Sequence, residues 1–65
     1  MVLTDTDPMP FSMHKGKEMA NVPSNWLKWY WGENVHDYVN GRFMYDNQKA
    51  VMAYIEDSFT NLPGL

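Results

Sequence analysis

Residues 23–32 read Pro-Ser-Asn-Trp-Leu-Lys-Trp-Tyr-Trp-Gly and form the most strongly patterned segment of this chain. Pro23 presets a helical backbone angle, and Ser24 or Asn25 can accept the first free N–H groups of a helix. Large apolar side chains then recur at helical spacing and form one broad stripe: Trp26, Leu27, Tyr30 and Trp31. We therefore expect a helix that begins near Ser24 and ends at Gly32.

A second helix is predicted near the C-terminus. Asp46 or Asn47 can serve as its N-cap, and apolar residues again follow at helical spacing: Val51, Met52, Ile55, Phe59 and Leu62. The predicted last residue is Asn61, because Pro63 and Gly64 cannot continue a helix. We expect Trp26 and Tyr30 of the first helix to pack against Ile55 and Phe59 of the second.

Residues 9–22 alternate loosely between apolar and polar side chains, which favours two short strands joined by a turn near His14–Lys17. Gly16 would supply the positive φ of that turn, and Pro10 is tolerated at a strand start or edge. Because two short helices cannot close a core by themselves at this size, we expect this hairpin to cover the seam between them.

The segment between the two helices is harder to interpret. Glu33–Val39 fits a helical turn or a strand, while Asn40-Gly41 is a two-residue hairpin signal, so residues 33–45 are predicted as an irregular or hairpin-like insert. The expected fold class is α+β. Residues 9–62 form a single small domain in this interpretation, with flexible tails at residues 1–8 and 63–65.

Composition restricts the possible functions. The 65 residues include no cysteine and ten aromatic side chains, and the formal net charge is −3. Disulfides and thiolate zinc sites are therefore excluded. No apolar run approaches a membrane span, and no secretory signal is visible, so a cytoplasmic location is expected. The acidic balance argues against tight nonspecific binding of duplex DNA.

No catalytic, cofactor or metal site is predicted, and we do not expect an enzyme. His14 and His36 lack the spacing that places two ligands on one helix face. The serines lack a nucleophile elbow. Glu56 and Asp57 are sequence neighbours that diverge on a helix, which is typical of a solvated face.

Positive charge concentrates in one turn, His14-Lys15-Gly16-Lys17. Gly16 could let backbone N–H groups approach a phosphate, and an exposed ring, Trp29, could stack on an unpaired base. Lysines in exposed turns also serve solubility alone. A contact with an anion or single-stranded nucleic acid and a plain solvated turn both remain open.

The aromatic-rich insert offers a second candidate contact surface, made of Tyr38, Arg42, Phe43 and Tyr45. Aromatic residues and arginine are common in protein interfaces. The preferred hypothesis is a non-enzymatic protein-binding regulator or accessory factor, with a homodimer as one form of it. A nucleic-acid-associated module that contacts phosphate through Lys15-Gly16-Lys17 is the alternative.

Several motifs occur in a recognisable order: Met9-Pro10-Phe11, His14-Lys15-Gly16-Lys17, Val22-Pro23, Trp26-Leu27 with Trp29, and Tyr54-Ile55-Glu56. This order resembles a small bacterial and phage domain family of unknown function that carries the label quorum-sensing-regulated virulence factor. The resemblance is close over residues 9–31 and looser over residues 51–62. It implies a phage or bacterial origin and, because such domains occur beside or fused to exonuclease-type enzymes, a role near DNA or RNA processing.

The chain departs from the family pattern at three places. Ser12 stands where the family favours glycine, Met13 stands where it favours lysine, and residues 33–50 form a longer segment before the last helix. The change at Met13 thins the basic patch, whereas Lys15, Gly16 and Lys17 are retained.

Overall fold

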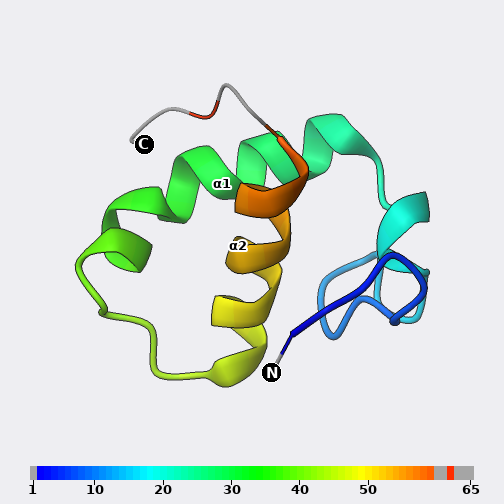
Figure 1. The fold of residues 1–65 in the computed structure, drawn as a ribbon, viewed down its shortest axis with the longest axis horizontal. Helices are drawn as coiled ribbons and strands as arrows, with labels where there is room; N and C mark the ends of the chain where they lie inside the picture. Colours follow the sequence, from blue (N-terminus) through cyan, green and yellow to red (C-terminus); the bar gives the residue numbers. More distant parts are fainter. Residues whose placement is uncertain (1, 60–61, 63–65) are drawn as a thin grey trace.

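The structure is a computed structural model that describes residues 2–59 and Leu62. It contains a short 3₁₀ turn, η1 (Met19–Asn21), and two α-helices, α1 (Ser24–Val39) and α2 (Asp46–Ser58). Figure 1 shows that α1 and α2 cross each other and that the N-terminal segment forms a separate lobe beside the start of α1. The fold of the described residues is all-α.

The predicted α+β class and its N-terminal β-hairpin are wrong. Residues 2–59 and 62 include no β-strand, and the chain only doubles back on itself through a single antiparallel bridge between Pro8 and Glu18. The backbone hydrogen bonds that hold this return include one from the Met9 N–H to the Lys17 carbonyl (2.7 Å) and one from the Met19 N–H to the Asp7 carbonyl (2.9 Å).

The physical reason lies on both sides of the turn. Pro8 and Pro10 have no N–H to donate, so two of three successive positions cannot extend a ladder. On the returning side, the chain enters η1 directly after Glu18. The turn itself contains Gly16 at φ +90° and Ser12 at φ +76°. Position 12 thus has a conformation that glycine adopts freely, and glycine is the residue that the family pattern favours there.

Helix α1 is longer than predicted, because it does not stop at Gly32 but continues to Val39. The apolar stripe of the helix also continues across Gly32: Leu27, Trp31, Val35 and Tyr38. The predicted hairpin-like insert at residues 33–45 is therefore wrong, and only residues 40–45 connect the two helices.

The Asn40-Gly41 pair ends α1 instead of forming a hairpin. Gly41 has φ +68° and its N–H donates to the carbonyl of Tyr38 (3.1 Å), while the Arg42 N–H donates to that of Asp37 (2.9 Å). This pair of bonds is a Schellman motif, in which a residue with positive φ closes the last helical turn. The Asn40-Gly41 pair, which also favours hairpin turns, therefore forms the C-terminal cap of α1.

Helix α2 begins at Asp46 with Tyr45 at the N-cap, so the predicted N-cap at Asp46 or Asn47 is wrong by one or two positions, and no side-chain hydrogen bond caps the helix. The helix ends at Ser58, and Phe59 is already extended at φ −124° and ψ 142°. The predicted end at Asn61 is therefore wrong, because the helix stops three residues earlier, and the predicted tail at residues 63–65 lies outside the described residues. The Lys28 ammonium lies 5.3 Å from the centre of the Phe59 ring and links α1 to this end of α2.

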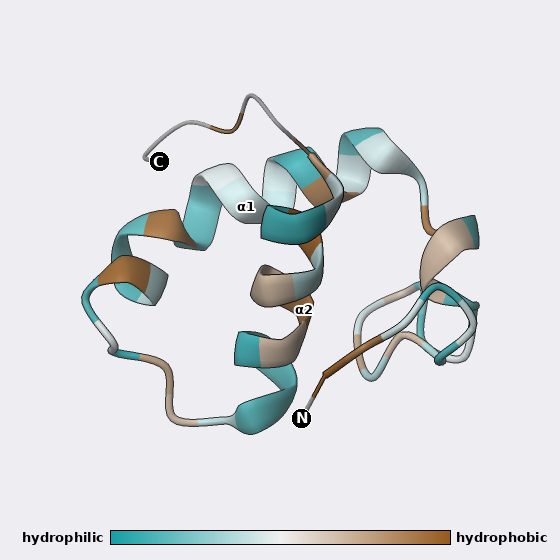
Figure 2. Ribbon diagram, in the orientation of Figure 1, coloured by the Kyte–Doolittle hydropathy of each residue, from teal (hydrophilic) through white to brown (hydrophobic). Residues whose placement is uncertain are grey.

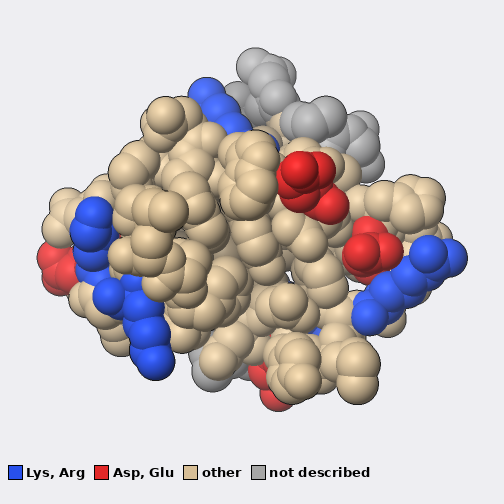
Figure 3. Space-filling view, turned by 180° about the vertical axis from the view of Figure 1, so that it is seen from behind, with Lys and Arg blue, Asp and Glu red and all other residues tan. Residues whose placement is uncertain are grey.

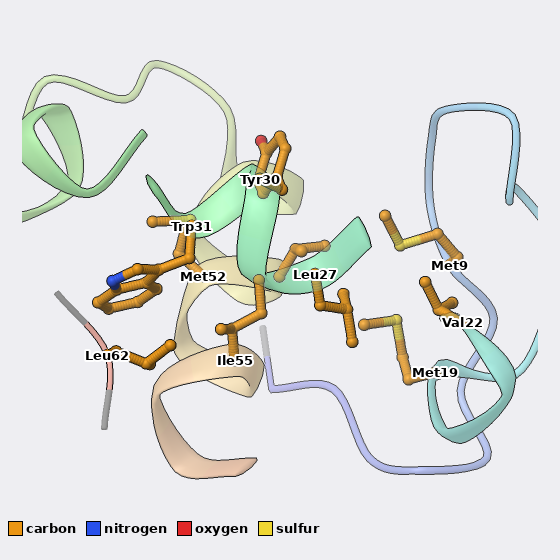
Figure 4. Close-up of a cluster of buried hydrophobic side chains, with 10 residues drawn as sticks. Met9, Met19, Val22, Leu27, Tyr30, Trp31, Met52, Ile55 and Leu62 are labelled. Carbon is orange, nitrogen blue, oxygen red and sulfur yellow. The ribbon is translucent and has the colours of Figure 1, made fainter. Parts of the chain in front are cut away.

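The core is built around α1. Figure 4 shows Trp31 beside Met52, Ile55 and Leu62 on one side, and Leu27 between this group and a second group from the N-terminal lobe, made of Met9, Met19 and Val22. Packing between the ring-bearing face of α1 and the aliphatic face of α2 was predicted, and Ile55 is fully buried. The ring at the centre is Trp31, however, because Trp26 is only half-buried at the edge.

Hydropathy alone underestimates α1. Much of the helix is pale or teal in Figure 2, although it contributes three buried residues: Leu27, Tyr30 and Trp31. Tryptophan and tyrosine carry one polar atom each and so rank near the middle of the hydropathy scale, yet each buries a large apolar surface. The stripe of rings is the better indicator of the core here.

The N-terminal segment, predicted as a tail, contacts α2. The Tyr54 hydroxyl donates to the Asp5 carboxylate at 2.7 Å, and Leu3 packs against the core. Within the segment, Asp7 accepts from the Thr4 N–H at 2.8 Å. The lobe is therefore attached to both helices.

The two interior glycines give a matched test of this topology. Gly41→Ala should reduce the free energy of unfolding by about 1 kcal/mol, because alanine is strained at positive φ. Gly32→Ala should raise it by roughly 0.5–1 kcal/mol, because Gly32 lies inside α1 with nothing within 4 Å of an added Cβ. Urea denaturation followed by circular dichroism measures both, and a destabilised Gly32→Ala would contradict the continuous helix.

Candidate functional site

The structure offers two candidate surfaces, and the first is the basic turn, residues 12–17. Its backbone N–H groups are all engaged between His14 and Lys17: His14 donates to Ser12 Oγ (3.1 Å), and the next three donate to the carbonyls of Ser12 (3.1 Å), Met9 (2.9 Å) and His14 (3.0 Å). A backbone cradle for phosphate needs free N–H groups. The backbone around Gly16 therefore cannot form that cradle, and Lys15 and Lys17 can meet an anion only through their side chains.

The His14 side chain fixes the basic turn to α1. Its ring is buried and meets the Trp26 ring edge-on, with 5.4 Å between ring centres and an angle of 83°. The Lys17 ammonium lies 3.3 Å from His14 Nδ1. This bond needs the neutral tautomer with its proton on Nε2, so that Nδ1 accepts. Lys17 is thereby held close to the turn, while Lys15 is exposed.

Trp26 continues this contact along α1. It stacks on Tyr30 at 5.3 Å, with the ring planes 7° apart, and its centre lies 6.0 Å from that of Trp29. Trp29 is 57% exposed. The structure therefore brings His14, Lys17 and Trp29 to one side of the molecule through Trp26, a residue that the sequence interpretation assigned to the core. Its spacing of three and four residues from Trp29 and Tyr30 was the available signal.

Tyr30 lies beneath this surface and also contacts the Phe11 ring at 5.6 Å. Its hydroxyl is buried and has no hydrogen-bond partner among the described residues. Burial raises the pKa of Tyr30 above the usual value of 10.

The second candidate is the loop surface, which we define as Tyr38, Val39, Arg42, Phe43, Met44 and Tyr45. Of the four residues predicted for protein contact, Tyr38 packs on Phe43 (6.3 Å between ring centres), while Arg42 and Tyr45 lie in the same connection between the helices. Tyr38 also meets the buried Trp31 edge-on at 5.8 Å. The loop surface is thus anchored directly to the core.

Large apolar side chains are exposed on the loop surface to an unusual degree. The exposed fractions are 57% for Val39, 85% for Met44 and 67% for Tyr45. The sequence interpretation missed Val39 and Met44. Solvent exposure of an apolar residue has no local sequence signal, since Val39 continues the helical pattern and Met44 is isolated in a connection.

A cleft of about 340 Å³ opens beside the loop surface, lined by Tyr38, Gly41, Phe43, Asp46, Lys49 and Ala53. The backbone of the connection beside this cleft also has unpaired hydrogen-bonding groups. Phe43 and Met44 make no backbone hydrogen bond within the described part of the chain. Tyr45 has an extended conformation, with φ −111° and ψ 134°.

The charged side chains are not spread evenly. Figure 3 shows Lys and Arg side chains at both ends and at the upper edge of one face, with Asp and Glu side chains toward its right-hand end and a broad uncharged area over its centre and left. At the loop surface, Arg42 forms a long ion pair of 3.9 Å with Asp37, and both side chains are well exposed. Such pairs contribute little to stability, so the Arg42 guanidinium is available to another partner.

Neither a metal site nor a membrane span is found in residues 2–59 and 62. No three acidic or histidine side chains gather there in a way that could hold an ion. Both helices in this part of the chain are too short or too polar to cross a bilayer.

Comparisons with protein-family models, with curated proteins and with solved structures gave no match. The family resemblance stated from the motifs therefore stays a prediction, and the function is argued from the two surfaces alone.

Tyr38 gives a test of the loop surface in solution. Burial raises its pKa, and the negative charges of Glu56 and Asp57 raise it further. A raised pKa means that the folded state favours the neutral phenol, so this contribution to stability is present below about pH 10 and is lost as the pH rises through the folded-state pKa. Glu56→Gln combined with Asp57→Asn should lower the Tyr38 pKa, as followed by nuclear magnetic resonance of its ring.

Glu18→Gln is the matched control for this titration, because Glu18 lies on the N-terminal lobe. An unchanged Tyr38 titration in the Glu56/Asp57 variant would show that the phenol does not face these carboxylates.

Proposed function

We propose that this chain is a non-enzymatic protein-interaction module whose contact site is the loop surface. One observation carries the proposal: Val39, Met44 and Tyr45, which are half of the large apolar side chains exposed among the described residues, lie within seven consecutive positions. Clustered exposed apolar side chains beside a cleft mark sites of protein association.

The composition of the loop surface agrees with this role. Tyrosine and arginine are enriched among the residues that dominate binding energy, and methionine adapts its shape to different partners. Tyr38 and Phe43 support the site from below through their contacts with Trp31 and each other. A partner would therefore contact aromatic rings that are anchored to the core, with side chains around them that can change conformation.

Peptides selected from a random display library on the immobilised chain test this function. We expect enriched peptides that bind in the micromolar range and lose at least about tenfold in affinity on Tyr45→Lys, the cost of a lost interface anchor. Met13→Lys is the matched control, because Met13 is equally exposed at 84% but lies in the basic turn. Equal loss in both variants would rule the loop surface out as the peptide site, and failure to enrich any peptide would exclude a foreign partner for it.

A second candidate function has its own support. The Lys17 side chain lies on the same side of the molecule as the Trp26 and Trp29 pair, since His14 bridges them, and Lys15 is exposed in the same turn. Lysines that meet phosphate beside rings that stack on bases are the elements of single-strand binding. The engaged backbone of the basic turn and the net charge of −3 limit this function to weak, salt-sensitive contact.

Fluorescence anisotropy with labelled single-stranded DNA and RNA at low salt tests this candidate. Lys15→Glu with Lys17→Glu should reduce affinity by at least about tenfold, because two phosphate contacts are lost. Arg42→Glu with Lys49→Glu makes the same total charge change at the loop surface and its cleft and should have a smaller effect. No binding at high micromolar protein would remove the candidate.

A further inference from the structure

We propose that the partner of the loop surface is a second copy of this chain, related to the first by a twofold axis that passes close to Met44. The inference rests on the proposed function and adds the identity of the partner. It is argued from charge, from the order of residues along the connection and from the unpaired backbone.

The charges around the loop surface are balanced. Two acidic residues, Asp37 and Asp46, and two basic residues, Arg42 and Lys49, surround it or line its cleft. The whole sequence has eight acidic and five basic residues, so six acidic and three basic residues lie elsewhere. Contact between two copies is therefore repulsive on average over the rest of the molecule and neutral at the loop surface.

A twofold contact also requires a surface that complements itself. Residues 42–46 read Arg-Phe-Met-Tyr-Asp. When this segment runs antiparallel to its own copy with Met44 on the axis, Arg42 faces Asp46 of the second copy. The order of charges is thus the one that antiparallel self-pairing needs.

The aromatic residues follow the same symmetry. Phe43 faces Tyr45 of the second copy in this arrangement, and the cleft of about 340 Å³ beside Phe43 has room for a phenol ring. Tyr45 is largely exposed in the single chain, so its ring is free to enter the cleft of the other copy. Aromatic pairs across antiparallel segments stabilise such contacts.

The backbone of the connection can take part as well. Phe43 and Met44 have no backbone hydrogen bond within residues 2–59 and 62. These groups could bond across the axis, as in an antiparallel pair. The contact area is small compared with the roughly 800 Å² per partner of a stable complex, so we expect a weak dimer with a Kd of about tens to hundreds of micromolar.

Sedimentation velocity over a concentration series tests the proposal. The wild-type chain should change from monomer to dimer as its concentration rises to about 1 millimolar, several times the expected Kd. Met44→Lys and Met44→Glu should each remain monomeric, because like charges then face each other on the axis. An equal mixture of the two variants should restore the dimer, since lysine then faces glutamate.

Met13→Lys and Met13→Glu are the matched controls and should associate like the wild type. Met44 is 85% exposed, so its variants should keep the wild-type circular dichroism spectrum. A wild-type chain that stays monomeric throughout overturns the proposal, as does a dimer that both Met44 variants retain.

Cysteine cross-linking gives a second, independent readout. The chain has no cysteine, so Met44→Cys introduces a single thiol. Residues that face each other across an antiparallel pair have the Cα separation that a disulfide needs. Mild oxidation should therefore link Met44→Cys into covalent dimers much faster than Met13→Cys, and equal rates would contradict the axis at Met44.

The two proposals fail separately in these experiments. Selected peptides that bind the loop surface of a strictly monomeric chain would keep the proposed function and remove the second copy as its partner. A dimer that depends on Met44, in a chain that enriches no peptide, would retain the self-contact and exclude other partners of the loop surface.

Discussion

Leu27 and Trp31 of α1 must be covered on two sides at once, and a single partner helix can cover only one of these sides. Helix α2 covers Trp31 through Met52 and Ile55, while the N-terminal lobe covers Leu27 through Met9 and Met19. On folding, a chain of 65 residues buries only about 60% of the surface that its unfolded chain exposes, so each of these contacts is a large part of its stability. The rest of the architecture follows from this need for a cover on both sides of α1.

The N-terminal lobe meets this need without a sheet. Its return is held by isolated hydrogen bonds and by residues with positive φ, Ser12 and Gly16. The lobe has to place apolar side chains against α1, and Met9, Met19 and Val22 do so with little regular secondary structure. An alternating pattern therefore predicted the reversal of the chain correctly in its position and wrongly in its secondary structure.

The sequence predicted the two helices and the burial of Ile55 because helical spacing of apolar residues is a strong local signal. The prediction was wrong at Gly32 and at Asn40-Gly41, because glycine is compatible with a helix interior, a helix end or a hairpin turn. Gly32 was predicted to end the first helix, although Val35 and Tyr38 continue its apolar stripe. Gly41 ends α1 with the positive φ that a hairpin turn would also need. Tertiary packing of the stripe decided between these outcomes.

The candidate sites were predicted unevenly for a related reason. Residue type identified the basic turn and the aromatic residues of the loop surface. The role of Trp26 as a bridge depends on His14, which is distant in sequence, and the engaged N–H groups of the turn depend on backbone geometry. The exposure of Val39 and Met44 depends on where the core ends, and no local pattern carries that information.

The methionines of the described residues divide sharply by solvent access, which makes them natural reporters of the motions of this chain. Met9, Met19 and Met52 are fully buried, whereas Met13 and Met44 are open to solvent. Peroxide converts accessible thioethers to polar sulfoxides, and it can reach a buried sulfur only when the structure around it opens. The oxidation rates of Met9 and Met52 would therefore reveal whether the N-terminal lobe lifts away from α1 before the two helices separate.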